Sequence, residues 1–510
     1  MRLHLPQTAR AIFQWSLGAY LLGTGLHSVW PGTKIPSFIW PAVAVTGVLW
    51  GYAARLSKTQ RKAPLQARSR LVWSSFVLLA VFVLGVWRFD ATLPGAQDGL
   101  TPWVGESISF SGRVISSVVG RFGKTAVIRI DTAAGQNLSC PGCQVLVRLK
   151  FRSAIDVGAR VSGVCRLAAL KPVESGDVWR RSLARRGVWF ECQGMSDVQL
   201  LARPAPWNVI SRLTTWRFWV TARIARTLPR DEATLLSGIL YGDRALSDEQ
   251  ADLMRRAGLM HLVAVSGSNV TIVVTLCLAF ALSLGLRRQQ TFWIVTVAVA
   301  AFVGFVGFSA SVLRAALMGW LILLSRELGR IPSATRLLLI AAVVMTAFNP
   351  WSLVFDAGFG LSFLATWGLL VWTPILQRKF TWLPERFGVR ASVATTCSAT
   401  LMTTPYLAWA FGRMSLAGLI TNVFALPLVA WIMLLGAVTA LWGNLPGWQL
   451  VAVPSFGLLR LLTHIAQIAD FLPWLDLRVP ELDFVWLLAI YALMWRFWRQ
   501  VKDNTDLSTR

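Results

Sequence analysis

Residues 415–442 read SLAGLITNVFALPLVAWIMLLGAVTALW, a stretch without a single charged side chain. An α-helix needs about 20 apolar residues to cross the hydrocarbon core of a bilayer, so this stretch predicts a membrane-spanning helix. Similar stretches recur along the 510-residue chain, of which 55% is hydrophobic and only 15% is charged. Because charged residues make up about 25% of a soluble domain, we predict an α-helical polytopic membrane protein.

The hydropathy pattern predicts about twelve transmembrane helices. Six basic residues and no acidic one separate the second span from the third, which predicts a cytoplasmic loop there. Both termini are then cytoplasmic, including a tail at residues 501–510, and residues 90–260 are extracytoplasmic. The predicted spans cover residues 12–30, 37–54 and 71–89 before a soluble insert, and 261–286, 291–308, 310–325, 335–348, 356–376, 390–411, 415–442, 449–471 and 484–498 after it.

The soluble insert at residues 90–206 has the pattern of a β-rich domain. Polar and apolar residues alternate in four short runs, at 107–110, 126–130, 144–149 and 160–165. Alternation with a period of two residues, between turns rich in Gly, Pro and Asp, is typical of half-buried strands. The insert therefore predicts a small barrel or sandwich of about five strands, and an OB-like barrel would suit a nucleic-acid role.

The insert is basic, although it is predicted to lie outside the cell membrane. It holds fifteen Lys and Arg residues against nine acidic ones, and the usual inward bias of positive charge does not explain this surplus. A polyanion such as DNA would explain it, and a basic face that contacts anionic lipid is the alternative. The candidate DNA-binding residues are Arg113, Arg129, Arg148, Lys150, Arg152, Arg180, Arg181, Arg185 and Arg186.

Four of the six cysteines, Cys140, Cys143, Cys165 and Cys192, lie in the insert. Cysteines of an exported domain tend to form disulfides, so up to two bridges are predicted, with three possible pairings. Cys140 and Cys143 would alternatively form half of a zinc or redox site, but no second Cys-x-x-Cys pair supports that interpretation. The four histidines have no ligand-like spacing, and we expect no metal and no cofactor.

Residues 207–260 connect the insert to the later spans. Apolar residues recur at helical spacing over residues 208–228, and four arginines lie between them. Such a basic amphipathic helix is typical of the lipid headgroup region. The alternative is an ordinary helix that packs on the bundle.

Several ordered blocks carry a family resemblance. Residues 236–244 read LSGILYGDR and residues 257–270 read AGLMHLVAVSGSNV, followed by SVLRAALM at 311–318, DAGFGLSFLA at 356–365 and NVFALP at 422–427. Together they resemble the ComEC family, the bacterial competence proteins that carry single-stranded DNA across the cell membrane. The resemblance is strongest over residues 213–498 and marks residues 261–500 as the channel domain.

The resemblance implies a surface DNA receptor outside and a helicase-like ATPase motor inside. This chain has no Walker A pattern, so the energy for transport would come from that motor or from the membrane gradient. Many relatives carry His where this chain has Asn269. Many also end in a metallo-β-lactamase-like domain, whose His-x-His-x-Asp-His cluster is absent here. We therefore expect a short form that relies on a separate nuclease.

Small polar residues and one arginine mark the predicted DNA path. Ser266, Gly267, Ser268 and Asn269 allow helices to approach closely or interrupt a helix beside a cavity, unless their hydroxyls bond back to their own helix. An arginine at mid-bilayer costs about 2.5–3.5 kcal/mol, so Arg314 is expected to face the bundle interior. Asp356 is a candidate structural partner of Arg314; the alternative is that the Arg314 side chain snorkels to the lipid headgroups. The candidate path residues are His261, Ser266, Gly267, Ser268, Asn269, Arg314 and Asp356.

Two rival functions use the same residues. An intramembrane serine hydrolase or protease would pair Ser266 with His261 or His464. On one regular helix His261 and Ser266 lie about 140° apart, so the pair would need neighbouring helices. An anion or lipid permease would be built around Arg314, but it leaves the basic insert unexplained.

Overall fold

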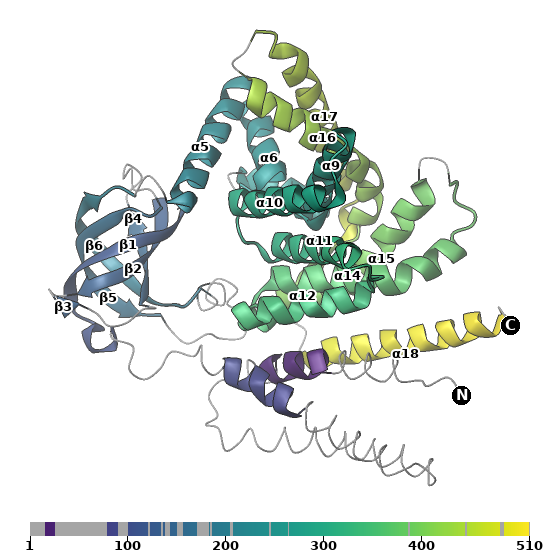
Figure 1. The fold of residues 1–510 in the computed structure, drawn as a ribbon, viewed down its shortest axis with the longest axis horizontal. Helices are drawn as coiled ribbons and strands as arrows, with labels where there is room; N and C mark the ends of the chain where they lie inside the picture. Colours follow the sequence, from purple (N-terminus) through teal and green to yellow (C-terminus); the bar gives the residue numbers. More distant parts are fainter. Residues whose placement is uncertain are drawn as a thin grey trace. The chain divides into compact units, whose positions relative to one another are not determined.

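The chain divides into two compact units in the computed structural model (Figure 1). The first unit holds Met1–Thr215 and Leu328–Asp356, and the second holds Trp216–Glu327 and Ala357–Arg510. The structure describes residues 16–25, 79–89, 100–120, 123–133, 136–137, 143–149, 157–170, 183, 186–204, 208–243, 246–263, 265–385, 388–443, 446–479 and 484–508.

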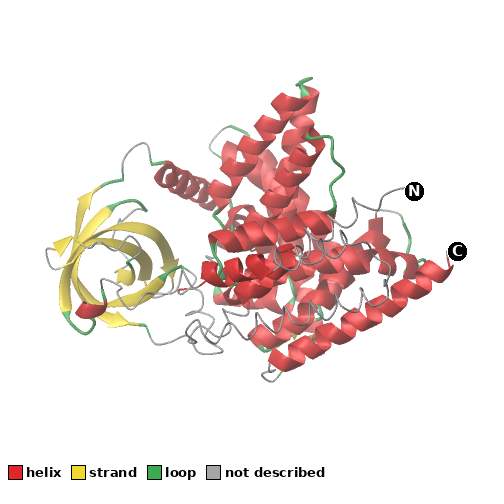
Figure 2. Cartoon of the chain, turned by 60° about the horizontal axis from the view of Figure 1, so that its bottom comes forward, coloured by secondary structure: helices red, strands yellow, loops and turns green. Residues whose placement is uncertain are grey.

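The predicted β-rich insert is confirmed as a closed five-stranded barrel in the first unit (Figure 2). Its strands follow one another in the order β1-β5-β6-β4-β2, and β2 pairs with β1 to close the ring. β4 and β6 are parallel, while the other neighbours are antiparallel. The strands are β1 (Ser107–Gly120), β2 (Gly123–Ala133), the short β3 (Gln136–Asn137), β4 (Gln144–Leu149), β5 (Arg160–Ala169) and β6 (Val188–Ala202), with a 3₁₀ turn η2 (Thr101–Trp103) before them.

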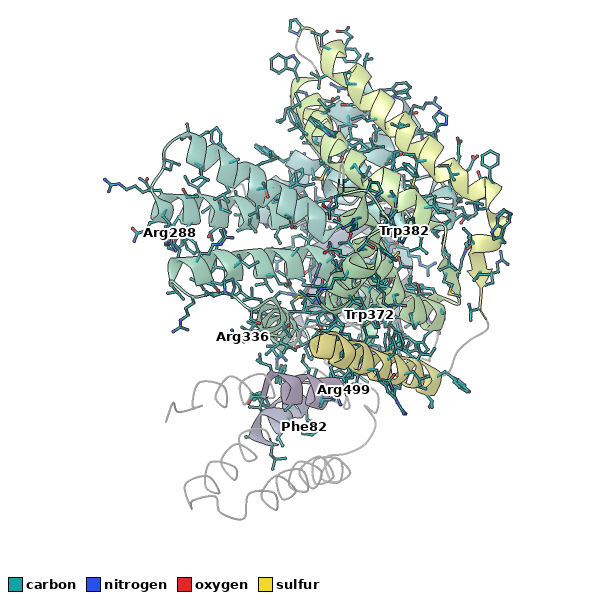
Figure 3. All side chains as sticks on the ribbon, turned by 90° about the vertical axis from the view of Figure 1, so that its right-hand side faces the viewer. Phe82, Arg288, Arg336, Trp372, Trp382 and Arg499 are labelled. Carbon is teal, nitrogen blue, oxygen red and sulfur yellow. A yellow bond between two sulfur atoms is a disulfide. The ribbon has the colours of Figure 1, made fainter. Side chains whose placement is uncertain are left out.

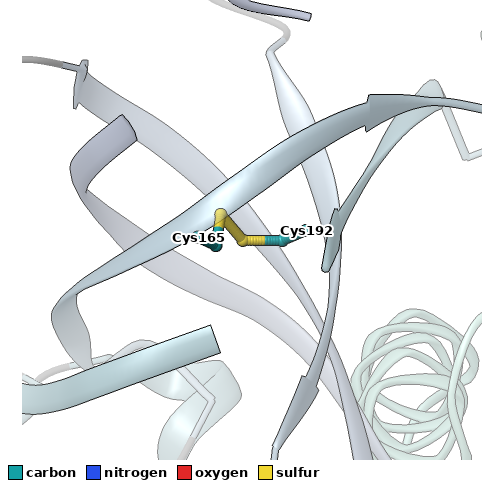
Figure 4. The surroundings of a disulfide bond; sticks show 2 residues. All are labelled: Cys165 and Cys192. Carbon is teal, nitrogen blue, oxygen red and sulfur yellow. A yellow bond between two sulfur atoms is a disulfide. The ribbon is translucent and has the colours of Figure 1, made fainter. Parts of the chain in front are cut away.

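Alternation along the strands fills the barrel. Val145 and Val147 of β4 and Val161 of β5 are almost fully buried in one core cluster, while Leu146 between the two valines is buried in a second cluster with Val127 and Val188. Cys165 of β5 and Cys192 of β6 form a disulfide inside this core (Figure 4). Cys143 is disulfide-bonded as well. Cys140 lies outside the described residues.

The described residues of the first unit also include helices at residues 16–25 and Leu79–Phe89, with α12 (Ala334–Phe348) and α13 (Ser352–Phe355). The first two approach closely at glycines, because a Cβ at Gly23 would lie 2.2 Å from the carbonyl oxygen of Phe82. Arg88 donates to the carbonyl oxygens of Ala347 at 2.7 Å and Phe348 at 3.1 Å. The arginine thus satisfies carbonyls that the end of α12 leaves without intrahelical partners.

The second unit is a helical bundle. α5 (Val209–Thr227) enters it from the first unit. The remaining helices are α6 (Arg230–Tyr241), α7 (Asp248–Arg256), α8 (Met260–Val263), α9 (Gly267–Ser283), α10 (Arg288–Val306), α11 (Ala310–Glu327), α14 (Ala357–Lys379), α15 (Val389–Phe411), α16 (Gly418–Trp442), α17 (Gln449–Gln467) and α18 (Phe484–Ser508), with 3₁₀ turns η4 (Ile468–Phe471) and η5 (Pro473–Leu475).

Eight of the nine spans predicted after the insert each overlap one α-helix of the described residues, and the first, 261–286, overlaps the short α8 and α9. Four of these helices are long and apolar enough to cross a membrane: α10, α14, α16 and α17, the last extended to Phe471. Three of the four, α14, α16 and α17, contain an internal proline. Prolines are more frequent in transmembrane helices than in soluble ones. The number of twelve crossings stays a prediction.

α6 lies in the core of the second unit although it is only 12 residues long. Leu235, Leu236 and Ile239 are at most 1% exposed. A Cβ at Gly436 of α16 would lie 2.3 Å from Leu236, so the glycine lets the two helices approach closely. α5, by contrast, exposes large apolar side chains such as Phe218.

A two-stranded ladder joins the loops before α16 and after α17. It pairs β7 (Arg413–Ser415) with β8 (Asp476–Arg478). Arg413 donates two hydrogen bonds to the carboxylate of Asp476, at 2.8 and 2.5 Å. These bonds, with the positive charge that they bring, lower the pKa of Asp476 below its ordinary value.

Candidate functional site

The motif at residues 257–270 forms a break between two helices of the second unit. α8 ends at Val263, and α9 begins at Gly267 with Ser266 as its extended N-cap residue. The span predicted from residue 261 therefore begins only at Gly267. Interruption of the helix is one of the two effects that the small polar residues predicted.

Asn269 fixes the start of α9 to the end of α6. Its side-chain nitrogen donates to the carbonyl oxygen of Ile239 at 2.8 Å, and its side-chain oxygen accepts from the Ser266 hydroxyl at 3.0 Å. The last carbonyls of a helix have no intrahelical partner, so Asn269 supplies one to α6. Asn269 is 1% exposed, and a buried amide of this kind is costly to leave without its partners. Asn269 thus ties two of the sequence blocks together.

Gly267 leaves the space that the Arg314 side chain occupies. A Cβ at Gly267 would lie 2.9 Å from a terminal guanidinium nitrogen of Arg314 and 3.3 Å from Ala315. Both contacts are closer than ordinary van der Waals contact, so any larger residue would push the guanidinium away. The glycine of the SGSN sequence and the arginine on α11 therefore form one site.

Hydroxyl groups of α14 surround the same guanidinium. Arg314 donates to the hydroxyl of Thr366, and Thr366 in turn donates to the carbonyl oxygen of Ser362 at 2.9 Å. The Ser362 hydroxyl donates to Ser311 of α11 at 3.4 Å. The guanidinium carbon lies 6.0 Å from the centroid of the Phe363 ring. Three blocks of the sequence thus meet at Arg314, from α9, α11 and α14.

The charge of Arg314 has no acidic partner among the ion pairs of the described residues. Its Nε atom is buried and makes no hydrogen bond within that part of the chain. Asp356 belongs to the other unit, so its pairing with Arg314 stays a prediction. A buried guanidinium with a free donor is an electrostatically favourable place for an anion.

The two histidines of the rival hydrolase function form hydrogen bonds with groups only three residues away in the chain. His261 shares a hydrogen bond of 3.0 Å with the carbonyl oxygen of Gly258 through Nδ1. His464 shares one of 2.9 Å with the Gln467 side chain. Within the described ranges, no three His, Cys, Asp or Glu side chains gather as metal ligands would.

The start of α16, just before the last sequence block, packs against the second block. Thr421 of α16 donates to the carbonyl oxygen of Ala257 at 2.7 Å. Gly258 has a positive φ of 69°, and a Cβ there would lie 2.8 Å from the Cα of Gly418. Asn422, which follows Thr421 in α16, is 9% exposed, and its side-chain oxygen is buried without a hydrogen-bond partner in the described structure. The loop after α7 therefore requires glycine at residue 258, where the start of α16 approaches it.

A family model described as competence protein matches residues 239–501, which is more than half of the chain. The chain belongs to the competence protein family. The resemblance that the five blocks predicted is thereby confirmed. ComE operon protein 3 of Bacillus subtilis (strain 168) is 29% identical over 283 residues, which cover 52% of this chain and 34% of that protein. The match thus spans about a third of that relative's length, and no solved structure matches.

The barrel lies before the region that the competence model matches. Arg113, Arg129, Arg148 and Arg186 are exposed on it. Arg148 forms an ion pair of 3.0 Å with Glu191. The remaining candidates, Lys150, Arg152, Arg180, Arg181 and Arg185, lie outside the described residues.

Strand register places three arginines in one row on the barrel's outer surface. Arg113 of β1 is opposite Arg129 of β2 on one side and opposite Arg160 of β5 on the other. Arg160 bonds Asp131 at 3.1 Å, so the row keeps an excess of positive charge. Like charges directly opposite each other destabilise a sheet unless an anion lies between them. Arg160 was not among the predicted residues, because register between distant strands is not visible in the sequence.

A second arginine inside an apolar span, Arg460, was not predicted as a candidate from the sequence. Arg460 lies in the middle of α17, a candidate membrane span, and Glu232 of α6 bonds it at 2.9 Å. The Glu232 side chain is only 8% exposed. The rule that marked Arg314, a charge inside an apolar span, applies equally to Arg460.

Proposed function

We propose that this competence-family protein conducts single-stranded DNA across the cytoplasmic membrane. Arg314 is the observation that carries the proposal. It is a cation inside an apolar helix, its Nε donor is free among the described residues, and its partner is a hydroxyl instead of a carboxylate. Such an arginine is costly to keep unless an anion compensates it, and a moving phosphate chain is an anion of suitable chemistry.

The surroundings of Arg314 support a transient ligand. Gly267 leaves the terminal nitrogens free of side-chain crowding, and the Ser311 hydroxyl, which accepts from Ser362, has a proton to donate to an anion without adding charge. A fixed carboxylate at this place would compete with phosphate. Weak, exchangeable contacts favour passage, because conduction requires sites that bind and release.

The barrel supports DNA capture on the outer face. Its closed order, with parallel β4 and β6, agrees with an OB-like barrel, a fold that binds oligonucleotides on its strands and loops. The row of Arg113, Arg129 and Arg160 would contact phosphates, which are read without regard to sequence. The barrel would thus gather the strand, and the helical bundle would pass it on.

Topology follows from the proposal. Twelve helices would cross the membrane with residues 90–260 outside and both termini in the cytoplasm, a proposal that the four apolar helices of the described chain support. A surface DNA receptor, a cytoplasmic ATPase motor and a separate nuclease would act with it, without a cofactor. Each of these partners is carried over from the family resemblance.

Replacement of Arg314 tests the proposal. In a transformable host, Arg314→Gln should abolish entry of labelled DNA into the cytoplasm and leave surface-bound DNA unchanged. Arg314→Lys should keep partial uptake, because a moving strand needs the charge more than the planar fork. Arg326→Gln, at the exposed end of the same helix, is the matched control.

Normal uptake by a stably expressed Arg314→Gln protein would remove this residue from the DNA path. If Arg314 instead pairs with Asp356, each single neutralisation should lower the amount of folded protein and the double neutralisation should restore it. Immunoblots of the membrane fraction separate the two cases.

A further inference from the structure

An apolar groove runs along α14 in the second unit, between α15 and α18. It consists of two cavities, of about 400 Å³ and 230 Å³, which share Trp372 and Met494 in their walls. Figure 3 labels Trp372 on α14 and Arg499 on α18. α18 is held there by a hydrogen bond of 2.8 Å from the Tyr491 hydroxyl to the carbonyl oxygen of Met402, and by stacking of Phe497 on Trp372.

The groove is long enough for a lipid chain. Its lining on α14 extends from Leu364 to Lys379. At a rise of 1.5 Å per residue this segment is about 22 Å long. One leaflet of the hydrocarbon core is about 15 Å thick, since the whole core is about 30 Å.

The two ends of the groove differ in polarity. Leu376, Leu401 and Phe497 give it apolar walls, and Lys379 is the one charged residue among those that line it. Lys379 is exposed in the last turn of α14. Tyr491 is the polar lining residue of the other cavity, and its hydroxyl is already bonded to Met402.

Further positive charge lies on the same two helices. Arg378 precedes Lys379, and Arg499 is exposed on α18, two residues before the lining residue Val501. No acidic side chain lines either cavity in the described structure. An anion beside Lys379 would therefore meet one cation and no carboxylate among the residues that line the groove.

We propose that this groove binds an anionic phospholipid, with one acyl chain along α14 and the phosphate headgroup beside Lys379. The apolar walls seat the acyl chain through van der Waals packing, because a chain that is already in hydrocarbon gains no hydrophobic transfer energy on entering the groove. Lys379 provides the preference for negative headgroups, because a basic residue near the membrane surface is worth about 1 kcal/mol toward anionic lipid. This lipid site is separate from the proposed DNA path, and the proposal does not depend on whether the protein transports DNA.

Native mass spectrometry of the full-length protein tests the proposal. The purified protein is incubated in detergent with equal amounts of phosphatidylglycerol and phosphatidylcholine, and the retained lipids are counted. Wild type should retain phosphatidylglycerol preferentially. Lys379→Gln should lower that preference about fivefold, the factor that corresponds to about 1 kcal/mol, and Lys379→Arg should keep it.

Two further variants distinguish binding of the acyl chain in the groove from recognition of the headgroup charge. Leu401→Trp fills the groove with an apolar side chain and should reduce retention of both lipids. Arg326→Gln removes a cation from the last turn of α11, another apolar helix, and should change neither. Retention of the two lipids without preference by wild type, or an unchanged preference in Lys379→Gln, would overturn the proposal. Loss of a dimer in Leu401→Trp without loss of lipid would assign the groove to a second copy of the chain and overturn it as well.

Discussion

Arg314 and Arg460 are both arginines within apolar helices of the same unit, but Arg460 is exposed whereas Arg314 is partly buried, and their partners differ. Arg460 meets the carboxylate of Glu232 at 2.9 Å, whereas Arg314 meets the hydroxyl of Thr366 and keeps a buried donor without a partner in the described structure. A neutralised cation holds α6 and α17 together. A cation left without a carboxylate is available to a ligand, so the partner and not the charge separates a structural arginine from a candidate functional one.

The largest expected effect lies on the structural side of this comparison. Glu232→Gln should lower the free energy of unfolding by about 2 kcal/mol, because the neutral amide replaces a charge-assisted hydrogen bond and leaves Arg460 without its counterion. Thermal unfolding of the purified protein in detergent measures the change. Glu249→Gln, in the exposed first turn of α7, controls for the loss of a negative charge at a helix start and should have little effect.

Arg460→Gln and the double variant complete the cycle. The double variant should be less destabilised than the two single variants added together. Additive losses would show that the pair makes no joint contribution, and the contrast with Arg314 would then lose its meaning.

The second expected effect is a loss of transformation activity and not a loss of folding stability. Gly267→Ala places a methyl group 2.9 Å from the Arg314 guanidinium, whose flexible end must move away. Transformation should fall about tenfold, the factor that about 1.4 kcal/mol of lost interaction represents. Gly319→Ala on α11 has nothing within 4 Å of the added methyl group and should leave transformation unchanged. Equal transformation by both variants would argue that the guanidinium position is unimportant.

A smaller effect is expected at the row of Arg113, Arg129 and Arg160 on the barrel. The three arginines outnumber the one carboxylate, Asp131, that pairs with the row. Changing Arg113 and Arg129 to Gln should weaken binding of single-stranded DNA to the full-length protein. The slope of log affinity against log salt should become shallower by about 1.4, because each lost phosphate contact contributes about 0.7. Arg166→Gln removes an exposed cation outside the row, from a side chain that bonds the carbonyl oxygen of Gly105. An equal change in that control would assign the effect to overall charge.

The smallest effect belongs to the paired, partly exposed Arg413 and Asp476. The lowered pKa of Asp476 means that its contribution to stability is complete above the ordinary carboxyl pKa and is lost as the pH falls through the lowered value. Wild type should exceed Asp476→Asn in unfolding temperature at pH 6, by an amount equivalent to less than about 1 kcal/mol. The difference should shrink as the pH falls below the ordinary carboxyl pKa and vanish once it is below the lowered value. A difference that grows on acidification would contradict the ion pair.

Much of the fold could be predicted from the sequence because membrane helices and half-buried strands leave local patterns. The charge-free stretch at 415–442 and the alternation at 144–149 each correspond to the element that their periodicity predicts. α6 was harder, since its 12 residues begin with Arg230, Asp231 and Glu232 and are too short for a span. Only the packing of α16 and α17 shows that this short helix is buried.

The site was predictable only in part, because its contacts join residues far apart in the chain. Arg314 and Gly267 were singled out from local sequence, yet their proximity depends on how α9 and α11 pack. The bond from Asn269 to Ile239 crosses 30 residues, and the row at Arg113 depends on strand register. Leu262 to Val265 is continuously apolar, so nothing in that run signalled the end of α8.

The bridge between Cys165 and Cys192 closes a covalent ring in the chain, since the two residues are separated by 27 positions. A protease that cuts once within this ring opens a backbone bond but releases no fragment. The two products stay joined through β5 and β6 and migrate as one species in a denaturing gel without reductant. They separate only after reduction, so a single nick in this part of the barrel leaves the protein in one piece.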